Sequence, residues 1–455
     1  MPDTTLPTLS VGPVRQTARI LSLDVLRGFA VLGILVMNIQ SFSMIGVAYI
    51  NPTAYGDLTG ANYVVWLLCH VLADMKFLSI FSMLFGAGIV LMTSRREAAT
   101  GRSAGVHYRR MGWLLVIGAM HAYLLWYGDV LFSYAMCGFL VFLFRRRKPV
   151  TLIILGLAVV GVATCISLLF HFSLPQWPDE AIVELQTVWQ PTEETVAKEV
   201  ATYRGGWLGQ FRDRAPNALF FETFFFLMLT LWRAGGLMLV GMGLFKLGFF
   251  SAAQSVRAYM TTVVVGFIGG LALILYGVQR NTTLEWAFER VFFLGAQFNY
   301  WGSLFFCLAW AALIMLIVKL DLLSGVTRRL ATVGQMALTN YITQTLICTT
   351  IFYGHGLGLY GKVERLWQLA IVVAVWILQL IWSPLWLRRY RFGPMEWLWR
   401  SLTYWKRQPM VRAILPTTFS TYPNSADRLK GMVEVSFSTL LTEIDRYRKA
   451  QEGRS

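Results

Sequence analysis

The stretch Leu23-Asp24-Val25-Leu26-Arg27-Gly28 runs straight into apolar residues that end at Asn38, so an acid and a base open a long hydrophobic run. On a helix Asp24 and Arg27 are neighbours, and Arg27 and Asn38 lie about three turns apart on nearly one face. Charged groups at membrane depth are costly and usually pair or face a polar interior, so these three residues are predicted to bind substrate. The alternative is a cytoplasmic positive flank at Arg27, neutralised by Asp24, with Asn38 bonding a neighbouring helix.

The composition is that of a polytopic membrane protein. Of the 455 residues 56% are hydrophobic and 14% are charged, which is more apolar than a soluble core requires. The mean hydropathy of +0.55 agrees. We therefore predict an all-α transmembrane bundle. About ten runs have the length that a bilayer requires: 25–47, 74–93, 111–127, 130–144, 150–171, 218–245, 256–277, 295–318, 331–353 and 366–387.

The net charge of +16 is distributed as membrane orientation requires, so we expect membrane lipids and no nucleic acid as partners. Arg and Lys cluster in alternate short connections, and the opposite connections carry the acidic residues. This alternation predicts that both termini are cytoplasmic. The predicted parts are a cytoplasmic segment at 1–19, a membrane domain at 20–405 with a long extracytoplasmic loop at 172–217, and a cytoplasmic amphipathic tail at 406–455.

Two segments outside the predicted spans have helical patterns. In the long loop, Thr192-Glu193-Glu194 opens a pattern typical of a helix. This helix is either a lid over an outward cavity or a packed interfacial helix, and we favour packing. In the tail, apolar residues from Leu429 to Tyr447 recur every three or four positions, although 433–437 alternates as a strand would.

Neither cysteine nor histidine follows a structural or metal-binding pattern. The five cysteines show no close pairs and the five histidines are dispersed, so we expect no disulfide framework and no metal site. Residues 356–361 match GxGxxG, but no strand precedes them, and we interpret the glycines as a tight turn.

Several polar residues are predicted at the outer ends of different spans. The apolar region 61–92 is too long for one crossing, so we expect a break near Asp74 that places Lys76 at the outer rim. His121, Asp129 and Asn38 belong to the same level. These groups are predicted to face one outward pocket, in which Lys76 binds substrate.

His121 is the predicted general base and Asp129 the carboxylate that orients it, since imidazole titrates near neutrality. The alternative is a structural histidine, with Asp129 capping a hairpin. Eight residues separate the two, so direct contact requires a bend at Gly128. Arg233 is the most deeply placed charge; it is predicted to bind a phosphate or an oxyanion, or alternatively to pair with Asp24 or Glu222.

Four stretches together resemble a known family. They are the opening at residues 23–38, the run 121–129, the stretch 335–341 and the stretch 391–403. In order and spacing they resemble the YeiB family of bacterial inner-membrane proteins, which is distantly similar to membrane acyltransferases. The resemblance implies a multi-pass inner-membrane protein with no permanently bound cofactor, acyl-CoA as the donor, and a glycan or lipid acceptor. In those relatives a His often takes the place of Asn38 or follows in the outer loop, whereas residues 41–60 here contain none.

Two functions therefore fit the sequence. The first is an acyltransferase that moves an acyl group to a hydroxyl or amine at the outer face. The alternative is a membrane transporter or lipid flippase, which polar residues on several spans suit almost as well. We find no convincing internal repeat of the kind common in transporters, which favours the enzyme.

Overall fold

The computed structural model describes residues 20–412. The predicted N-terminal segment at 1–19 and the tail from 413 onward lie outside the described residues. Within them the chain is helical, with one isolated antiparallel bridge between Tyr390 and Val411 and no strand, which confirms the all-α prediction. The helices are α1 (Leu21–Ser43), α2 (Gly60–Leu72), α3 (Lys76–Thr100), α4 (Ala104–Leu124), α5 (Leu131–Val141), α6 (Pro149–Ser173), α7 (Asp179–Trp189), α8 (Glu193–Arg204), α9 (Trp207–Phe220), α10 (Leu231–Lys246), α11 (Val256–Thr283), α12 (Phe288–Arg290), α13 (Ala296–Lys319), α14 (Ser324–Gln335), α15 (Ala337–Phe352), α16 (Arg365–Arg389) and α17 (Pro394–Tyr404).

Seven helical segments of the described chain are long and apolar enough to cross a membrane. Three further predicted spans fall on α4, α5 and α15, which are helices but are not among these seven. The count of ten spans therefore stays a prediction. The seven segments are Leu21–Ser43, Gly60–Thr100, Pro149–Gln176, Trp207–Lys246, Val256–Thr283, Phe288–Lys319 and Arg365–Arg389.

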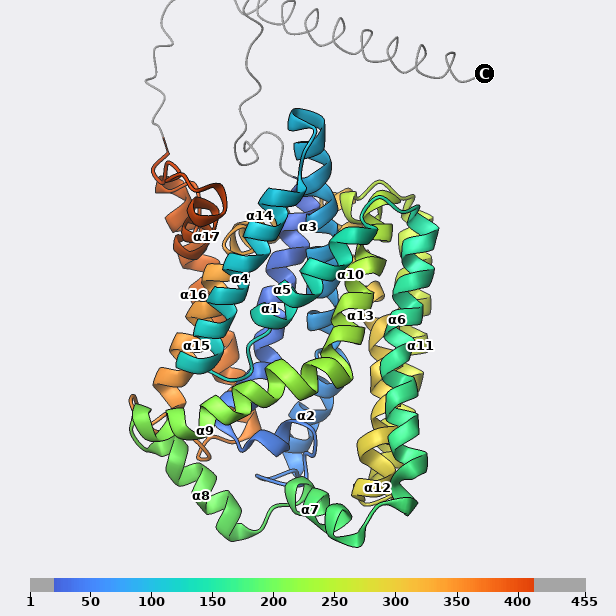
Figure 1. Ribbon diagram of the computed structural model, residues 1–455, viewed down its shortest axis with the longest axis vertical. Helices are drawn as coiled ribbons and strands as arrows, with labels where there is room; N and C mark the ends of the chain where they lie inside the picture. The colour runs from blue at the N-terminus through green and yellow to red at the C-terminus, as the bar shows by residue number, and fades with distance from the viewer. Residues whose placement is uncertain (1–19, 413–455) are drawn as a thin grey trace, which may run out of the picture. The chain divides into compact units, whose positions relative to one another are not determined.

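Helix α1 runs through the centre of the bundle and is buried along almost its whole length (Figure 1). It packs closely on α14 because glycines face each other at the crossing. A Cβ added to Gly28 would lie 1.9 Å from the carbonyl oxygen of Leu330, and one added to Gly334 would lie 1.9 Å from that of Asp24. Small residues permit such close approach between membrane helices.

The second apolar region breaks where the sequence predicts. Helix α2 ends at Leu72 and α3 begins at Lys76, and Met75 between them has a φ of 64°. A left-handed conformation is uncommon outside glycine, so tertiary contacts hold this bend.

The long loop folds into helices that cross one end of the bundle (Figure 1). Helix α8 starts at the predicted place, where the Thr192 side chain accepts a hydrogen bond from the Thr195 backbone N–H at 3.3 Å. Its Tyr203 is buried, and the Glu199 carboxylate accepts hydrogen bonds from the Gly46 N–H and the Tyr360 hydroxyl. Helix α8 therefore packs against the protein.

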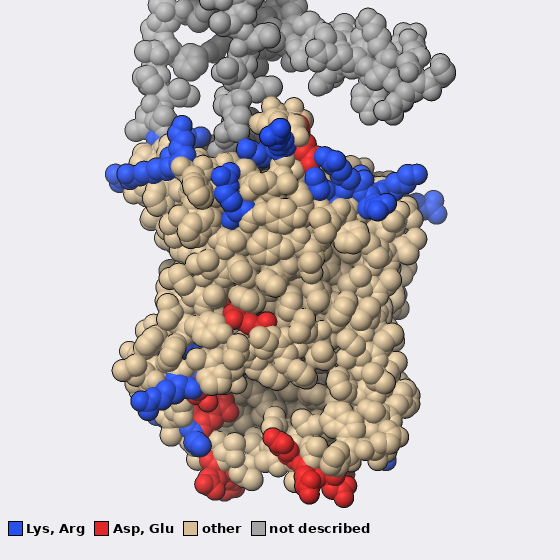
Figure 2. All heavy atoms as spheres, in the orientation of Figure 1, with Lys and Arg blue, Asp and Glu red and all other residues tan. Residues whose placement is uncertain are grey.

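Charge is segregated between the two ends of the described structure. Arg102 between α3 and α4, and Arg146 and Arg147 between α5 and α6, are exposed. Figure 2 shows Lys and Arg gathered at that end, and acidic side chains gathered at the opposite end, where α7 and α8 lie. Such segregation is what the positive-inside rule requires of a spanning bundle.

Candidate functional site

His121 and Asp129 are brought together by a reversal between α4 and α5. Helix α4 ends at Leu124, and the chain returns so that the His121 Nδ1 lies 2.8 Å from Asp129 Oδ1. The other carboxylate oxygen accepts the Phe132 N–H at 2.7 Å, in the first turn of α5. The helix ends before Gly128, so the bend comes earlier than the sequence suggests. Both side chains are only 1% exposed.

The second ring nitrogen of His121 contacts a hydroxyl that was not predicted from the sequence. His121 Nε2 lies 2.9 Å from Thr345 Oγ1 on α15. Because a carboxylate only accepts hydrogen bonds, we assign the imidazole proton to Nδ1, which leaves Nε2 to accept from the Thr345 hydroxyl. A carboxylate, an imidazole and a hydroxyl in line are the arrangement that activates a hydroxyl for attack. The signal in the sequence was the spacing of Tyr341, Thr345 and Thr349, one helical turn apart.

Lys76 belongs to a different polar cluster, between α2, α3 and α13. Its ammonium is fully buried and donates to the His70 carbonyl and to Asn299 Oδ1, each at 2.7 Å. The Asn299 amide in turn donates to Asp74 Oδ2 at 2.7 Å. Among residues 20–412 no hydrogen bond or ion pair joins this cluster to His121. The prediction that Lys76 shares the pocket of His121 therefore finds no contact in the structure.

Arg233 on α10 is buried against neutral oxygens. Its guanidinium donates to the Tyr300 carbonyl at 3.0 Å and to the hydroxyls of Ser79 and Ser303 at 3.0 and 2.6 Å. Within the described residues it forms no ion pair, so neither Asp24 nor Glu222 is its partner. Ser79 lies one turn after Lys76 on α3, which places both cations in one polar region.

The two ends of the polar face on α1 differ. Asp24 and Arg27 pair with each other at 2.9 Å. Asn38 is half-buried between buried neighbours, and its side chain makes no hydrogen bond with any described residue. At the start of α1 the two charged side chains therefore pair with each other, whereas the side chain of Asn38 is available to bind another polar group.

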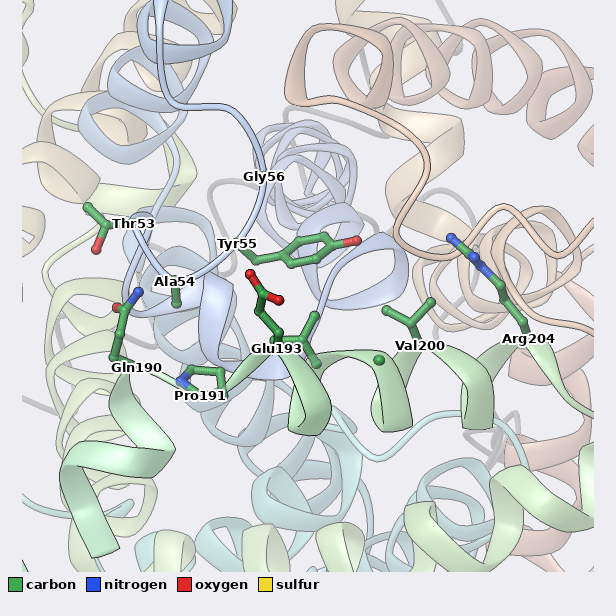
Figure 3. A pocket seen from close by; sticks show the side chains of 11 residues that line it. Thr53, Ala54, Tyr55, Gly56, Gln190, Pro191, Glu193, Val200 and Arg204 are labelled. Carbon is green, nitrogen blue, oxygen red and sulfur yellow. The ribbon is translucent and has the colours of Figure 1, made fainter. Parts of the chain in front are cut away.

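A cleft of about 580 Å³ lies between α8 and the loop that follows α1. Figure 3 shows Glu193, Val200 and Arg204 rising from α8 toward the loop that carries Tyr55. Arg204 Nε also donates to the Tyr360 carbonyl at 2.7 Å, which holds one wall of the cleft. An outward cavity beside this helix was the alternative to packing in the sequence-based prediction, but its lining residues were not predicted because they are far apart in sequence.

Comparison with known proteins finds related chains along nearly the whole length. The uncharacterised protein YeiB of Escherichia coli (strain K12) is 31% identical over 86% of this chain and 98% of its own. The chain belongs to the YeiB family. The uncharacterised protein YxaH of Bacillus subtilis (strain 168) is 31% identical over 89% of this chain and 98% of its own. Residues 244–406 match the family model described as "Protein of unknown function (DUF418)". No solved structure matches the chain.

Proposed function

We propose that this chain is an acyltransferase of the bacterial inner membrane, with both termini cytoplasmic, which moves an acyl group from acyl-CoA to a hydroxyl on a glycan or lipid. The observation that carries the proposal is the bonding of His121, whose two ring nitrogens contact a carboxylate at 2.8 Å and a hydroxyl at 2.9 Å. The seven long apolar helical segments of the described chain support the membrane location, and the similarity to a protein of Escherichia coli supports a bacterial membrane.

In the proposed reaction the acceptor hydroxyl takes the place that the Thr345 hydroxyl now holds at His121 Nε2. Nε2 takes the proton from the hydroxyl of the acceptor molecule. The oxygen of that hydroxyl attacks the thioester carbonyl carbon, so a C–O bond forms. The C–S bond then breaks, and the imidazolium returns the proton to the leaving thiolate. Asp129 fixes the tautomer and stabilises the imidazolium, as the carboxylate of a catalytic triad does.

Membrane transport is the second candidate, and the cluster around Lys76 favours it. Buried ionisable groups on several spans are typical of ion and proton pathways. Asp74 adds a buried carboxylate, whose Oδ2 lies 3.1 Å from His70 Nδ1. Transport would move an unmodified solute, and acyl transfer would leave a labelled acceptor.

The test uses membrane vesicles supplied with radiolabelled acetyl-CoA, prepared from cells with and without the protein. We expect protein-dependent label in the lipid or glycan fraction. His121→Gln should lower transfer at least 100-fold, since a positioned general base contributes about 10² to 10⁴. The matched control is Thr350→Val, an exposed threonine on the same helix as Thr345, which should transfer normally. Equal transfer by His121→Gln, at equal amounts of inserted protein, would remove His121 from the mechanism.

A further inference from the structure

A second group of buried polar atoms lies where α9 meets the end of α4. The indole Nε1 of Trp126, Oε1 of Gln210, Nη2 of Arg214 and the hydroxyl of Tyr353 have no hydrogen-bond partner among residues 20–412. All four side chains are nine-tenths buried or more. Buried polar groups are nearly always bonded, so such a group indicates a site that binds a polar molecule.

Helix α9 brings Arg214 to the last turn of α4. Its Nε donates to the Tyr123 carbonyl at 2.9 Å and its Nη1 reaches the Leu125 carbonyl at 3.5 Å. Trp207 anchors the same contact by donating its indole N–H to the Leu124 carbonyl at 3.0 Å. These bonds fix the guanidinium and leave its Nη2 to bind a further acceptor.

Gln210 and Tyr353 reach the same place from α9 and from the end of α15. The Gln210 amide donates to the carbonyls of Tyr203 and Gly205 at 3.0 and 2.8 Å, which leaves its Oε1 as an acceptor. The Tyr353 ring lies 5.0 Å from the Tyr203 ring. The Tyr353 hydroxyl also interacts electrostatically with the Arg214 guanidinium, so the two side chains lie in one neighbourhood.

The guanidinium of Arg214 is not neutralised by a close ion pair within the described chain, and the adjacent Asp213 acts on it only at longer range. The Arg214 side chain is fully buried, and it forms no ion pair with any residue from 20 to 412. The neighbouring Asp213 carboxylate instead accepts from Asn217 at 3.2 Å. A buried charge is costly unless it is paired, so an anionic oxygen on a ligand is the complement that this site lacks.

The group adjoins the proposed base. The Trp126 ring lies 6.4 Å from the His121 ring. On α15, Thr345 and Thr349 share one face at four-residue spacing, and Tyr353 follows directly after the helix ends at Phe352. The end of α15 therefore connects the contact at His121 Nε2 with the residue Tyr353 along the chain.

We infer that Trp126, Gln210, Arg214 and Tyr353 bind a phosphate ester that also carries hydroxyl groups. The phosphate oxygens accept from Arg214, Trp126 and Tyr353, and a ligand hydroxyl donates to Gln210 Oε1. The role of this ligand as the acyl acceptor rests on the proposed function; its binding does not. A water-soluble sugar phosphate and a lipid headgroup present the same chemistry.

The test measures binding by the purified full-length protein with no acyl donor present. One arm titrates radiolabelled glucose 1-phosphate, with unlabelled glucose as a competitor that lacks the phosphate. The other arm compares nanodiscs with and without phosphatidylglycerol. We expect saturable binding in one arm and no competition by glucose. Arg214→Gln should weaken binding at least tenfold, and Arg212→Gln, an exposed arginine on the same helix, should leave it unchanged.

Tyr353→Phe removes only a hydroxyl and keeps the inference testable if Arg214→Gln does not fold. It should weaken binding about threefold or more, as expected for one lost hydrogen bond. Absence of binding in both arms, or wild-type affinity in both variants, would overturn the inference. Binding without any acyl transfer would instead keep this site and contradict the proposed function.

Discussion

At the scale of the residue, the contact of Asp129 with His121 decides which nitrogen is basic. Asp129→Asn keeps the size of the side chain but allows its amide to donate to Nδ1, which would move the proton to Nε2. We expect acyl transfer to fall about 100-fold or more, with little change in thermal stability. The measurement is the initial rate of transfer at matched protein. Loss of folding without loss of rate per folded molecule would assign Asp129 a structural role.

Glu199 on α8 gives a pH dependence of stability. Burial raises the pKa of its carboxyl, and hydrogen bonds from Gly46 and Tyr360 oppose that rise. Between the unfolded and folded pKa values the native state binds more protons, so stability falls as pH rises through this range. Glu199→Gln keeps an oxygen acceptor for both bonds and removes the charge.

We therefore expect Glu199→Gln to raise the melting temperature at pH 8 relative to the wild type, and the difference to vanish below about pH 4, where the wild-type carboxyl is protonated in both states. Melting of the detergent-solubilised protein at both pH values checks this. A destabilised variant at pH 8 would mean that the bonds of Glu199 outweigh the cost of burying its charge.

At the scale of the element, the crossing of α1 and α14 depends on glycine. Gly28→Ala would bring a Cβ within 1.9 Å of the Leu330 carbonyl, so the helices must separate. We expect a loss of about 1–3 kcal/mol in stability, typical of overpacking. Gly88→Ala on α3, where a Cβ meets nothing within 4 Å, is the control and should be as stable as the wild type or slightly more so. Equal melting of both variants would contradict the close crossing.

Local sequence patterns predicted where helices begin and break, but they did not predict which distant residues contact each other. The start of α8 after Thr192 and the break before Lys76 both follow from a few adjacent residues, and both are present. The partner of His121 could not be read in this way, because Thr345 lies 224 positions away and only the packing of α4 against α15 unites them. The same reason explains why Lys76, predicted beside His121, bonds to Asn299.

Arg214 was not predicted as a binding residue for a different reason. In the sequence it lies in a loop helix among charged residues, where an exposed arginine is the ordinary expectation. Its full burial arises because α9 folds back onto the end of α4 and stacks the guanidinium 5.3 Å from the Trp207 ring. Burial of a surface-type residue by tertiary contact is not visible in local pattern.

At the scale of the whole molecule, the segregation of charge predicts the orientation in the membrane. The basic end between α3 and α4 should face the cytoplasm, and the cleft beside α8 should face outward. A single cysteine placed at exposed Glu194, in a background without the native cysteines, should react with an impermeant maleimide in intact cells. A cysteine at exposed Arg102 should react only after the membrane is opened. The reverse pattern would invert the proposed topology.

Purified protein reconstituted in liposomes tests the proposed orientation and the proposed chemistry of His121 in one experiment. Labelled acetyl-CoA is supplied on one side of the liposome membrane and an acceptor with a hydroxyl on the other. Maleimide labelling of the two cysteine variants shows which end of the protein faces each side. We expect transfer only when the donor is supplied at the basic end, and loss of that transfer in His121→Gln. Transfer that is unchanged in His121→Gln, or complete absence of transfer by inserted wild-type protein in both orientations, would contradict the proposed function.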